Sequence, residues 1–204
     1  MSGMDHHTPS VPGGQLNERE LLESALRELL IEKGIFSAED VEAQIKDMDG
    51  RTPKQGARLV ARYWSDPGFR DRANADLKAA AQELGIDTYV APDLVILENT
   101  PQLHHVVVCT LCSCYPRAIN GPPPSWYKSH DYRARAVSDT RAVLAEFDTV
   151  LPDDVEIRVV DASADCRYLV VPLRPDGTEG MSEEELAELV TEESMIGVAQ
   201  ALTP

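Results

Sequence analysis

Basic residues are scarce in this chain of 204 residues. Lys and Arg number 19 against 35 Asp and Glu, which gives a formal net charge of −16. The shortage argues against a nucleic-acid-binding protein, because such a protein needs a basic face to displace the counterions of the phosphates. It also argues against attraction to a membrane of anionic lipids. The acidic excess fits a solvated surface or a surface that faces a partner.

Long hydrophobic runs are also lacking. A strongly apolar run such as residues 106–108 is far shorter than the ~20 residues that span a bilayer. The first residues, MSGMDHHTPSVPGGQ, have no apolar core of the kind found in a signal peptide, so we expect a cytoplasmic protein. Cysteines number only 4, and in a reducing compartment they more often bind metals or react than form disulfides.

The patterning along the chain predicts an α+β fold in three segments. Residues 1–15 contain little to bury and are predicted to be a disordered tail. Residues 16–85 carry amphipathic helical patterns and are predicted to form a helical N-terminal arm. Residues 86–204 mix strand and helix signals and are predicted to form an α+β domain of layered α/β type. The modest apolar stripes of the arm need another surface, and a partner chain is one candidate.

Capping residues and apolar patterns place the individual elements. The arm is predicted to contain helices at residues 17–34, 37–47, 53–64 and 66–84. Short apolar or alternating runs predict strands at residues 94–97, 106–108, 155–160 and 168–173. Ser182, followed by three Glu residues, is predicted to cap a last helix.

Three of the four cysteines lie within six residues. Cys109, Cys112 and Cys114 have the spacing C-x2-C-x-C. A cubane iron–sulfur cluster would need a fourth cysteine. A disulfide between Cys112 and Cys114 would close a very tight ring. The segment is therefore predicted to hold a metal or a redox site.

A structural zinc site is one interpretation of this cluster. Such sites usually have four side-chain ligands in two separated pairs. The second pair is missing next to the cluster, so Cys166, or His104 with His105, would have to complete the set. We expect Cys166 instead to be a buried apolar cysteine.

The short Cys-Ser-Cys element allows a different metal site. Deprotonated backbone amides of Ser113 and Cys114, together with the sulfurs of Cys112 and Cys114, could form a nearly planar set of two nitrogens and two sulfurs. Cys109 would then supply an axial thiolate. These strong anionic donors suit a trivalent low-spin ion and leave a sixth position open. Spacing alone leaves the zinc, redox and unusual-metal interpretations open.

The sequence VCTLCSCYP at residues 108–116 resembles the metal-binding signature of the nitrile hydratase α-subunit family. The resemblance covers about residues 17–198. Further matching segments are ENT at 98–100, HHVVV at 104–108, PP at 123–124, WYK at 126–128, YR at 132–133, SEEEL at 182–186 and ESMIGV at 193–198. The resemblance also implies that the predicted metal-binding domain, residues 86–204, has the fold of that family's α chain.

The resemblance implies the composition of the metal site. It implies a non-corrin cobalt(III) held by Cys109, Cys112, Cys114 and the backbone nitrogens of Ser113 and Cys114. Thr110 matches the cobalt class, so iron(III) is the less favoured metal. The resemblance also implies oxidation of Cys112 to a sulfinic acid and of Cys114 to a sulfenic acid, which are successive states of sulfur oxidation.

The resemblance further implies an activity and partners. The activity is hydration of a small-molecule nitrile to its amide, with Cys114 and Ser113 as catalytic residues and a substrate as bulky as toyocamycin among the candidates. The partners are one or two β-type subunits, without which the chain is inactive, and an activator chaperone that inserts cobalt. No nucleic acid or membrane is expected as a partner.

Departures from the family pattern concern the substrate. The segment at residues 89–93 replaces a Gln-Gly-Glu element, Arg117 replaces a frequent Trp, and Met181 and Glu192 stand where Trp and Arg are frequent. Arg117 resembles the metal-binding subunit of thiocyanate hydrolase. The alternatives to a nitrile hydratase are therefore a thiocyanate hydrolase subunit and a non-catalytic metal-binding relative.

Overall fold

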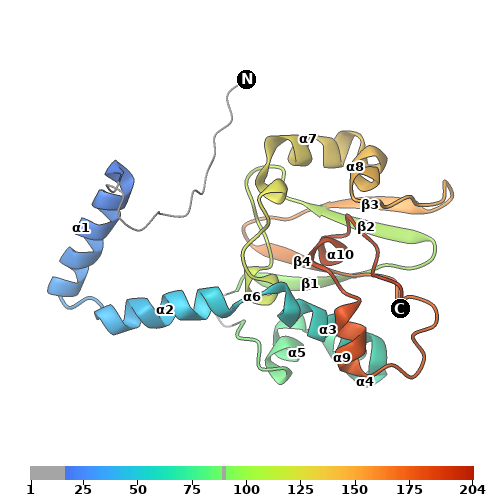
Figure 1. Cartoon of the computed structure of the whole chain (residues 1–204), viewed down its shortest axis with the longest axis horizontal. Helices are drawn as coiled ribbons and strands as arrows, with labels where there is room; N and C mark the ends of the chain where they lie inside the picture. The colour runs from blue at the N-terminus through green and yellow to red at the C-terminus, as the bar shows by residue number, and fades with distance from the viewer. Residues whose placement is uncertain (1–16, 89–90) are drawn as a thin grey trace. The chain divides into compact units, whose positions relative to one another are not determined.

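The computed structural model describes residues 17–88 and 91–204. The predicted tail at residues 1–15 lies outside them. Internal contacts divide the chain into two units, Met1–Asp47 and Met48–Pro204 (Figure 1). In the described ranges, no helix is long and apolar enough to cross a membrane.

The N-terminal unit is built from α1 (Glu18–Glu32) and the larger part of α2 (Ala38–Gly50). Asn17 begins α1 with a capping box, because its side chain accepts from the backbone N–H of Glu20, whose carboxylate accepts from the N–H of Asn17. The first two predicted helices are confirmed. No residue of either helix is buried, and several large apolar side chains are exposed, namely Leu21, Leu22, Leu26, Leu29 and Ile45.

Three helices begin the second unit: α3 (Pro53–Ser65), α4 (Pro67–Ala75) and α5 (Leu77–Glu83). The third predicted helix is confirmed. The prediction of one helix over residues 66–84 is wrong, because Asp76 adopts an extended backbone with φ −153° and ψ 94°. Its carboxylate accepts a hydrogen bond from the backbone N–H of Ala79 at 3.0 Å, so Asp76 caps a new helix.

The predicted strands are all present in the second unit: β1 (Asp93–Glu98), β2 (Leu103–Val108), β3 (Glu156–Asp161) and β4 (Cys166–Val171). Strand β1 pairs in parallel with β4, and β2 pairs in parallel with β3. The register of the second pair places Val108 opposite Asp161, so the end of β2 lies beside the end of β3. Helices and strands are mixed, as predicted for an α+β protein.

Short helices that the sequence analysis did not predict follow β2 and close the chain. They are α6 (Arg117–Asn120), the 3-10 helix η1 (Trp126–Lys128), α7 (His130–Ser138), α8 (Thr140–Glu146) and α10 (Glu192–Ile196). Ser182 caps α9 (Glu183–Glu188) as predicted. However, α9 is not the last helix, because Thr191 caps α10 after it.

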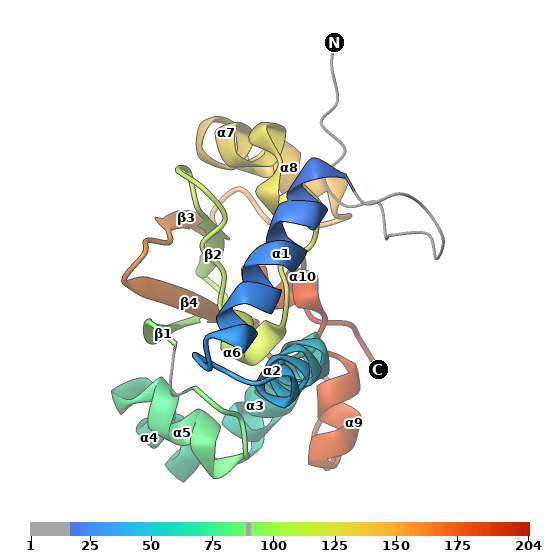
Figure 2. The ribbon, with the colours of Figure 1, turned by 90° about the vertical axis from the view of Figure 1, so that its left-hand side faces the viewer.

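Helices cover the strands from two sides. Figures 1 and 2 show α7 and α8 on one side and α3, α4, α5 and α9 on the other. One hydrophobic cluster joins α3–α5 to β1 and β4, and a second joins β2 to α7 and α8. Helices within the predicted arm therefore share a core with strands. The boundary predicted between residues 85 and 86 stays a prediction. The contacts within the chain give a different division, which falls after Asp47.

Candidate metal centre

Three thiols converge on a loop at the end of β2. Cys109 follows the last residue of the strand and is 1% exposed, whereas Cys112 is exposed and Cys114 is 8% exposed. The Sγ atom of Cys112 lies 3.5 Å from that of Cys109 and 3.3 Å from that of Cys114. All three sulfurs lie within 4.8 Å of one another. We call residues 109–114 the claw loop.

This arrangement fits a metal ion. The backbone N–H of Cys112 points to the Sγ of Cys109 at 3.3 Å, so the loop folds back over its first cysteine. Three sulfurs at van der Waals separation are mutually repulsive as thiolates, and a bound cation removes that repulsion. Across the part of the chain that the structure describes, this is the one group of three or more His, Cys, Asp or Glu residues with ligand spacing.

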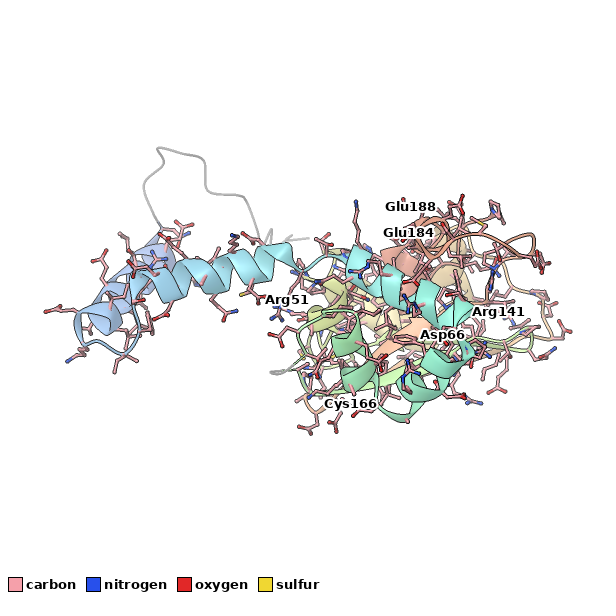
Figure 3. The ribbon with its side chains drawn as sticks, turned by 90° about the horizontal axis from the view of Figure 1, so that it is seen from below. Arg51, Asp66, Arg141, Cys166, Glu184 and Glu188 are labelled. Carbon is pink, nitrogen blue, oxygen red and sulfur yellow. The ribbon has the colours of Figure 1, made fainter. Side chains whose placement is uncertain are left out.

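The residues considered for a fourth zinc ligand do not join the claw loop. Cys166, which is labelled in Figure 3, begins β4 and is partly buried. It is not a member of the group of converging ligands. The ring of His104 is held by Gly197 and Asn99, at 2.7 Å from the Gly197 carbonyl oxygen and 3.2 Å from the Asn99 amide nitrogen. The four-ligand zinc site is therefore not formed by these side chains.

The pair of histidines has a structural role instead. The Oδ1 of Asn99 accepts from the backbone N–H of His105 at 2.8 Å, which directs the Nδ2 donor of Asn99 toward Nδ1 of His104. His104 is then neutral, with its proton on Nε2 and directed at the carbonyl oxygen of Gly197. Burial lowers the pKa of His104 and thus favours the neutral ring.

Asp161 holds the first half of the claw loop. The backbone N–H of Thr110 donates to Oδ1 of Asp161 at 3.0 Å, and the Thr110 hydroxyl donates to Oδ2 at 2.6 Å. Sequence analysis missed this contact. The parallel pairing of β2 with β3 explains it, because Asp161 stands opposite Val108, two residues before Thr110.

Two buried tyrosines, Tyr115 and Tyr127, hold the second half of the claw loop. The hydroxyl of Tyr127 donates to the carbonyl oxygen of Cys114 at 2.8 Å, and the ring of Tyr127 packs edge-on against Tyr115 at 5.2 Å. The Tyr115 hydroxyl donates to Oε1 of Glu192 at 2.7 Å. Burial raises the pKa of both tyrosines well above its usual range, so both hydroxyls remain donors.

The thiols differ in their protonation. Hydrogen bonds from the thiols of Cys114 and Cys109 lower the pKa of Cys112 to about 7. Burial raises the pKa of Cys114, although the cation of Arg167 acts in the opposite direction. Without a metal ion the buried sulfur therefore holds its proton, while coordination deprotonates a thiol outright.

A pocket of about 340 Å³ opens over the claw loop. Cys112, Ser113 and Cys114 form one part of its wall. Arg51, Arg117 and Arg167 also line it, together with apolar residues and prolines, and none of the lining residues that the structure describes is a carboxylate. The pocket thus carries positive charge in an acidic protein and has two of the thiols in its wall.

Comparison with known proteins matches the chain to the family model of the nitrile hydratase alpha chain over residues 17–199. The low-molecular weight cobalt-containing nitrile hydratase subunit alpha of Rhodococcus rhodochrous is 47% identical over 181 residues, which cover 88% of this chain and 87% of that protein. The thiocyanate hydrolase subunit gamma of Thiobacillus thioparus is 45% identical over 196 residues, which cover 91% and 81%.

Solved structures agree with these sequence matches. A recombinant thiocyanate hydrolase with partially modified cobalt centres matches with a TM-score of 0.84 and 44% identity, over 92% of this chain and 91% of the other. A double mutant of the Fe-type nitrile hydratase from Comamonas testosteroni Ni1 matches with a TM-score of 0.81 and 42% identity, over 91% of each chain. The chain therefore belongs to the nitrile hydratase alpha-chain family.

Proposed function

We propose that this chain is the metal-binding α subunit of a nitrile hydratase, which adds one water to a nitrile to give the amide. The observation that carries the proposal is the convergence of three cysteine sulfurs, two of which, those of Cys112 and Cys114, belong to residues that line a pocket. Membership of the family supports hydratase catalysis. The reaction needs only nitrile and water, and it has no redox co-substrate to bind.

The claw loop supplies the metal ligands in this proposal. These are the sulfurs of Cys109, Cys112 and Cys114 and the backbone nitrogens of Ser113 and Cys114. Cobalt is the proposed metal, supported by Thr110 and by the cobalt-containing relatives, although the Fe-type neighbour shares the fold. When bound, the trivalent ion supplies a Lewis acid that polarises the substrate and lowers the pKa of water.

Cys114 and Ser113 are the proposed catalytic residues because both line the pocket. In its sulfenic acid state Cys114 carries an oxygen in the pocket wall, which can attack the nitrile carbon as a nucleophile or, as a base, take a proton from the water that attacks it. The hydroxyl of Ser113 can donate a hydrogen bond to the substrate nitrogen or hold the attacking water. Oxidation of Cys112 to a sulfinic acid adds acceptor oxygens beside it.

A β-type partner is part of the proposal. Helices α1 and α2 bury none of their residues and expose large apolar side chains, which suits an N-terminal arm that packs on another subunit. We also propose that an activator chaperone inserts the cobalt. The chain alone is accordingly expected to lack activity.

Hydrolysis of thiocyanate is the second candidate function. The arginines of the pocket favour it, because Arg117 and Arg167 bring positive charge to a wall whose described residues include no carboxylate, and thiocyanate is an anion. A thiocyanate hydrolase subunit is among the relatives and supports this alternative. A neutral nitrile needs no such charge.

An assay of the assembled complex decides between these functions. The α chain is expressed with its β-type partner and chaperone, with cobalt and iron both supplied, and tested on acetonitrile, toyocamycin and thiocyanate. Amide formation supports the proposal, and formation of carbonyl sulfide and ammonia from thiocyanate alone replaces it with the second candidate. A metal-loaded complex that converts neither substrate type shows a non-catalytic relative. Cys166→Ala serves as the matched cysteine control for Cys114→Ala.

A further inference from the structure

A hydrogen bond joins Tyr115, the residue directly after the claw loop, to the C-terminal helix α10. The hydroxyl of Tyr115 donates to Oε1 of Glu192 at 2.7 Å, across 77 residues of sequence. Tyr115 directly follows Cys114 and is 4% exposed. Glu192 lies in the first turn of α10. The contact therefore fixes the residue that leaves the claw loop.

The ring of Tyr115 transmits this contact to the backbone of Cys114. It packs against Tyr127 with centroids 5.2 Å apart and an interplanar angle of 68°. The hydroxyl of Tyr127 in turn donates to the carbonyl oxygen of Cys114 at 2.8 Å. A rotation of the Tyr115 ring would disturb this packing and move the peptide groups on either side of Cys114.

Glu192 is the acceptor that the structure provides for this hydroxyl. Asn120 is fully buried, and its side-chain amide lowers the pKa of Tyr115 by acting as a hydrogen-bond donor to that hydroxyl, so it is not the acceptor for the Tyr115 proton. Space around Asn120 is tight, since a Cβ at Gly56 would lie 2.2 Å from its Oδ1. Asn120 is therefore poorly placed to move and replace Glu192.

The carboxylate of Glu192 is also reachable from outside. It lines a second pocket of about 330 Å³ together with Arg51, Thr52 and Pro122. Burial raises the pKa of Glu192, while the hydrogen bond from Tyr115 acts in the opposite direction. Because Glu192 lines this pocket, removal of its side chain would leave a gap that a small carboxylate such as acetate can enter.

We propose that Glu192 is a positioning residue for the proposed reaction, which holds Tyr115 in place and thereby fixes the peptide groups of Ser113 and Cys114 at the base of the pocket. The inference rests on the proposed function, in which those peptide nitrogens are ligands. Catalytic groups must be held by a supporting shell, because a displacement of about 1 Å can cost up to about 100-fold in rate.

Kinetics of the cobalt-loaded complex test the proposal. Glu192→Ala should lower kcat about tenfold with KM changed less than about twofold and cobalt content retained. Glu192→Gln should restore most of kcat, because its amide oxygen accepts the same hydrogen bond. Tyr115→Phe should match Glu192→Ala, and the double variant should be no slower. The control is Glu184→Gln, an exposed carboxylate on α9 that is labelled in Figure 3.

Two further readouts separate positioning from general stability. Acetate should partly restore kcat in Glu192→Ala and leave the wild type and Glu184→Gln unchanged. Hydrogen exchange of the metal-free chain should show faster exchange at residues 112–115 in Glu192→Ala, with the strands unaffected. Normal kcat and normal exchange in Glu192→Ala would overturn the proposal, as would equal losses in Glu192→Gln. A wild-type complex without turnover refutes the proposed function instead, while the exchange experiment still tests the positioning role.

Discussion

Removal of one buried hydroxyl should weaken the claw loop specifically. In Tyr127→Phe the carbonyl oxygen of Cys114 loses the donor that now lies at 2.8 Å. Tyr127 is 0% exposed, so solvent does not replace the donor. A buried acceptor without a partner costs about 1–3 kcal/mol, while the phenyl ring keeps its aromatic neighbours. We expect the free energy of unfolding to fall by that amount and the cobalt content to fall with it.

The matched control is Tyr132→Phe. The hydroxyl of Tyr132 donates to the carbonyl oxygen of Val107 at 2.7 Å, and this residue is 5% exposed. Urea denaturation should show a similar loss for both variants, because both remove a buried hydrogen bond of the same kind. Cobalt retention during dialysis against a chelator should decrease only for Tyr127→Phe. Equal retention in both variants, or a stability loss confined to Tyr132→Phe, would refute the reasoning.

Three other substitutions or conditions test the surroundings of the claw loop. Asp161→Asn should weaken both hydrogen bonds from Thr110 and lower the free energy of unfolding in urea by about 1 kcal/mol, and an unchanged midpoint would contradict this. Gly197→Ala should lower the free energy of unfolding, measured by thermal denaturation, by about 2–4 kcal/mol. The reason is that Gly197 has φ +86° and a Cβ there would lie 1.9 Å from the carbonyl oxygen of His105. The pKa of His104 is lower in the folded chain than in the unfolded chain, so the unfolded chain binds a proton first as the pH falls. Urea titrations should therefore show that the free energy of unfolding decreases as the pH drops below about 6.5. That pH dependence should be smaller in His104→Gln.

The local parts of the structure could be predicted from the sequence. The C-x2-C-x-C spacing brings three sulfurs together within one loop, so their convergence needs no distant residue. Strands β1 and β2 contain the apolar runs at residues 94–97 and 106–108, which predict strands; β2 is buried from His104 to Val108, whereas β1 buries only Leu94. Asn17 and Ser182 cap helices through contacts three residues away, which is also a local property.

The supports of the claw loop could not be predicted in this way. Asp161 lies 51 residues from Thr110 and Glu192 lies 77 residues from Tyr115, so each contact exists only once the strands and α10 are in place. Helix α7 was missed because it buries only Tyr132 and Ala136 and has little amphipathic pattern. The break at Asp76 was missed because an apolar pattern on both sides of it resembles one continuous helix.

Metal analysis of the assembled complex tests whether the three cysteines of the claw loop hold a cobalt ion. Protein is produced with cobalt and iron both available, and metal content is measured for wild type, Cys112→Ala, Cys114→Ala and Cys166→Ala, with circular dichroism to verify folding. We expect about one cobalt per α chain in wild type and Cys166→Ala, and little metal in the other two variants. Stoichiometric iron with negligible cobalt would contradict the choice of metal. Metal lost in Cys166→Ala and retained in Cys114→Ala would contradict the ligand set itself.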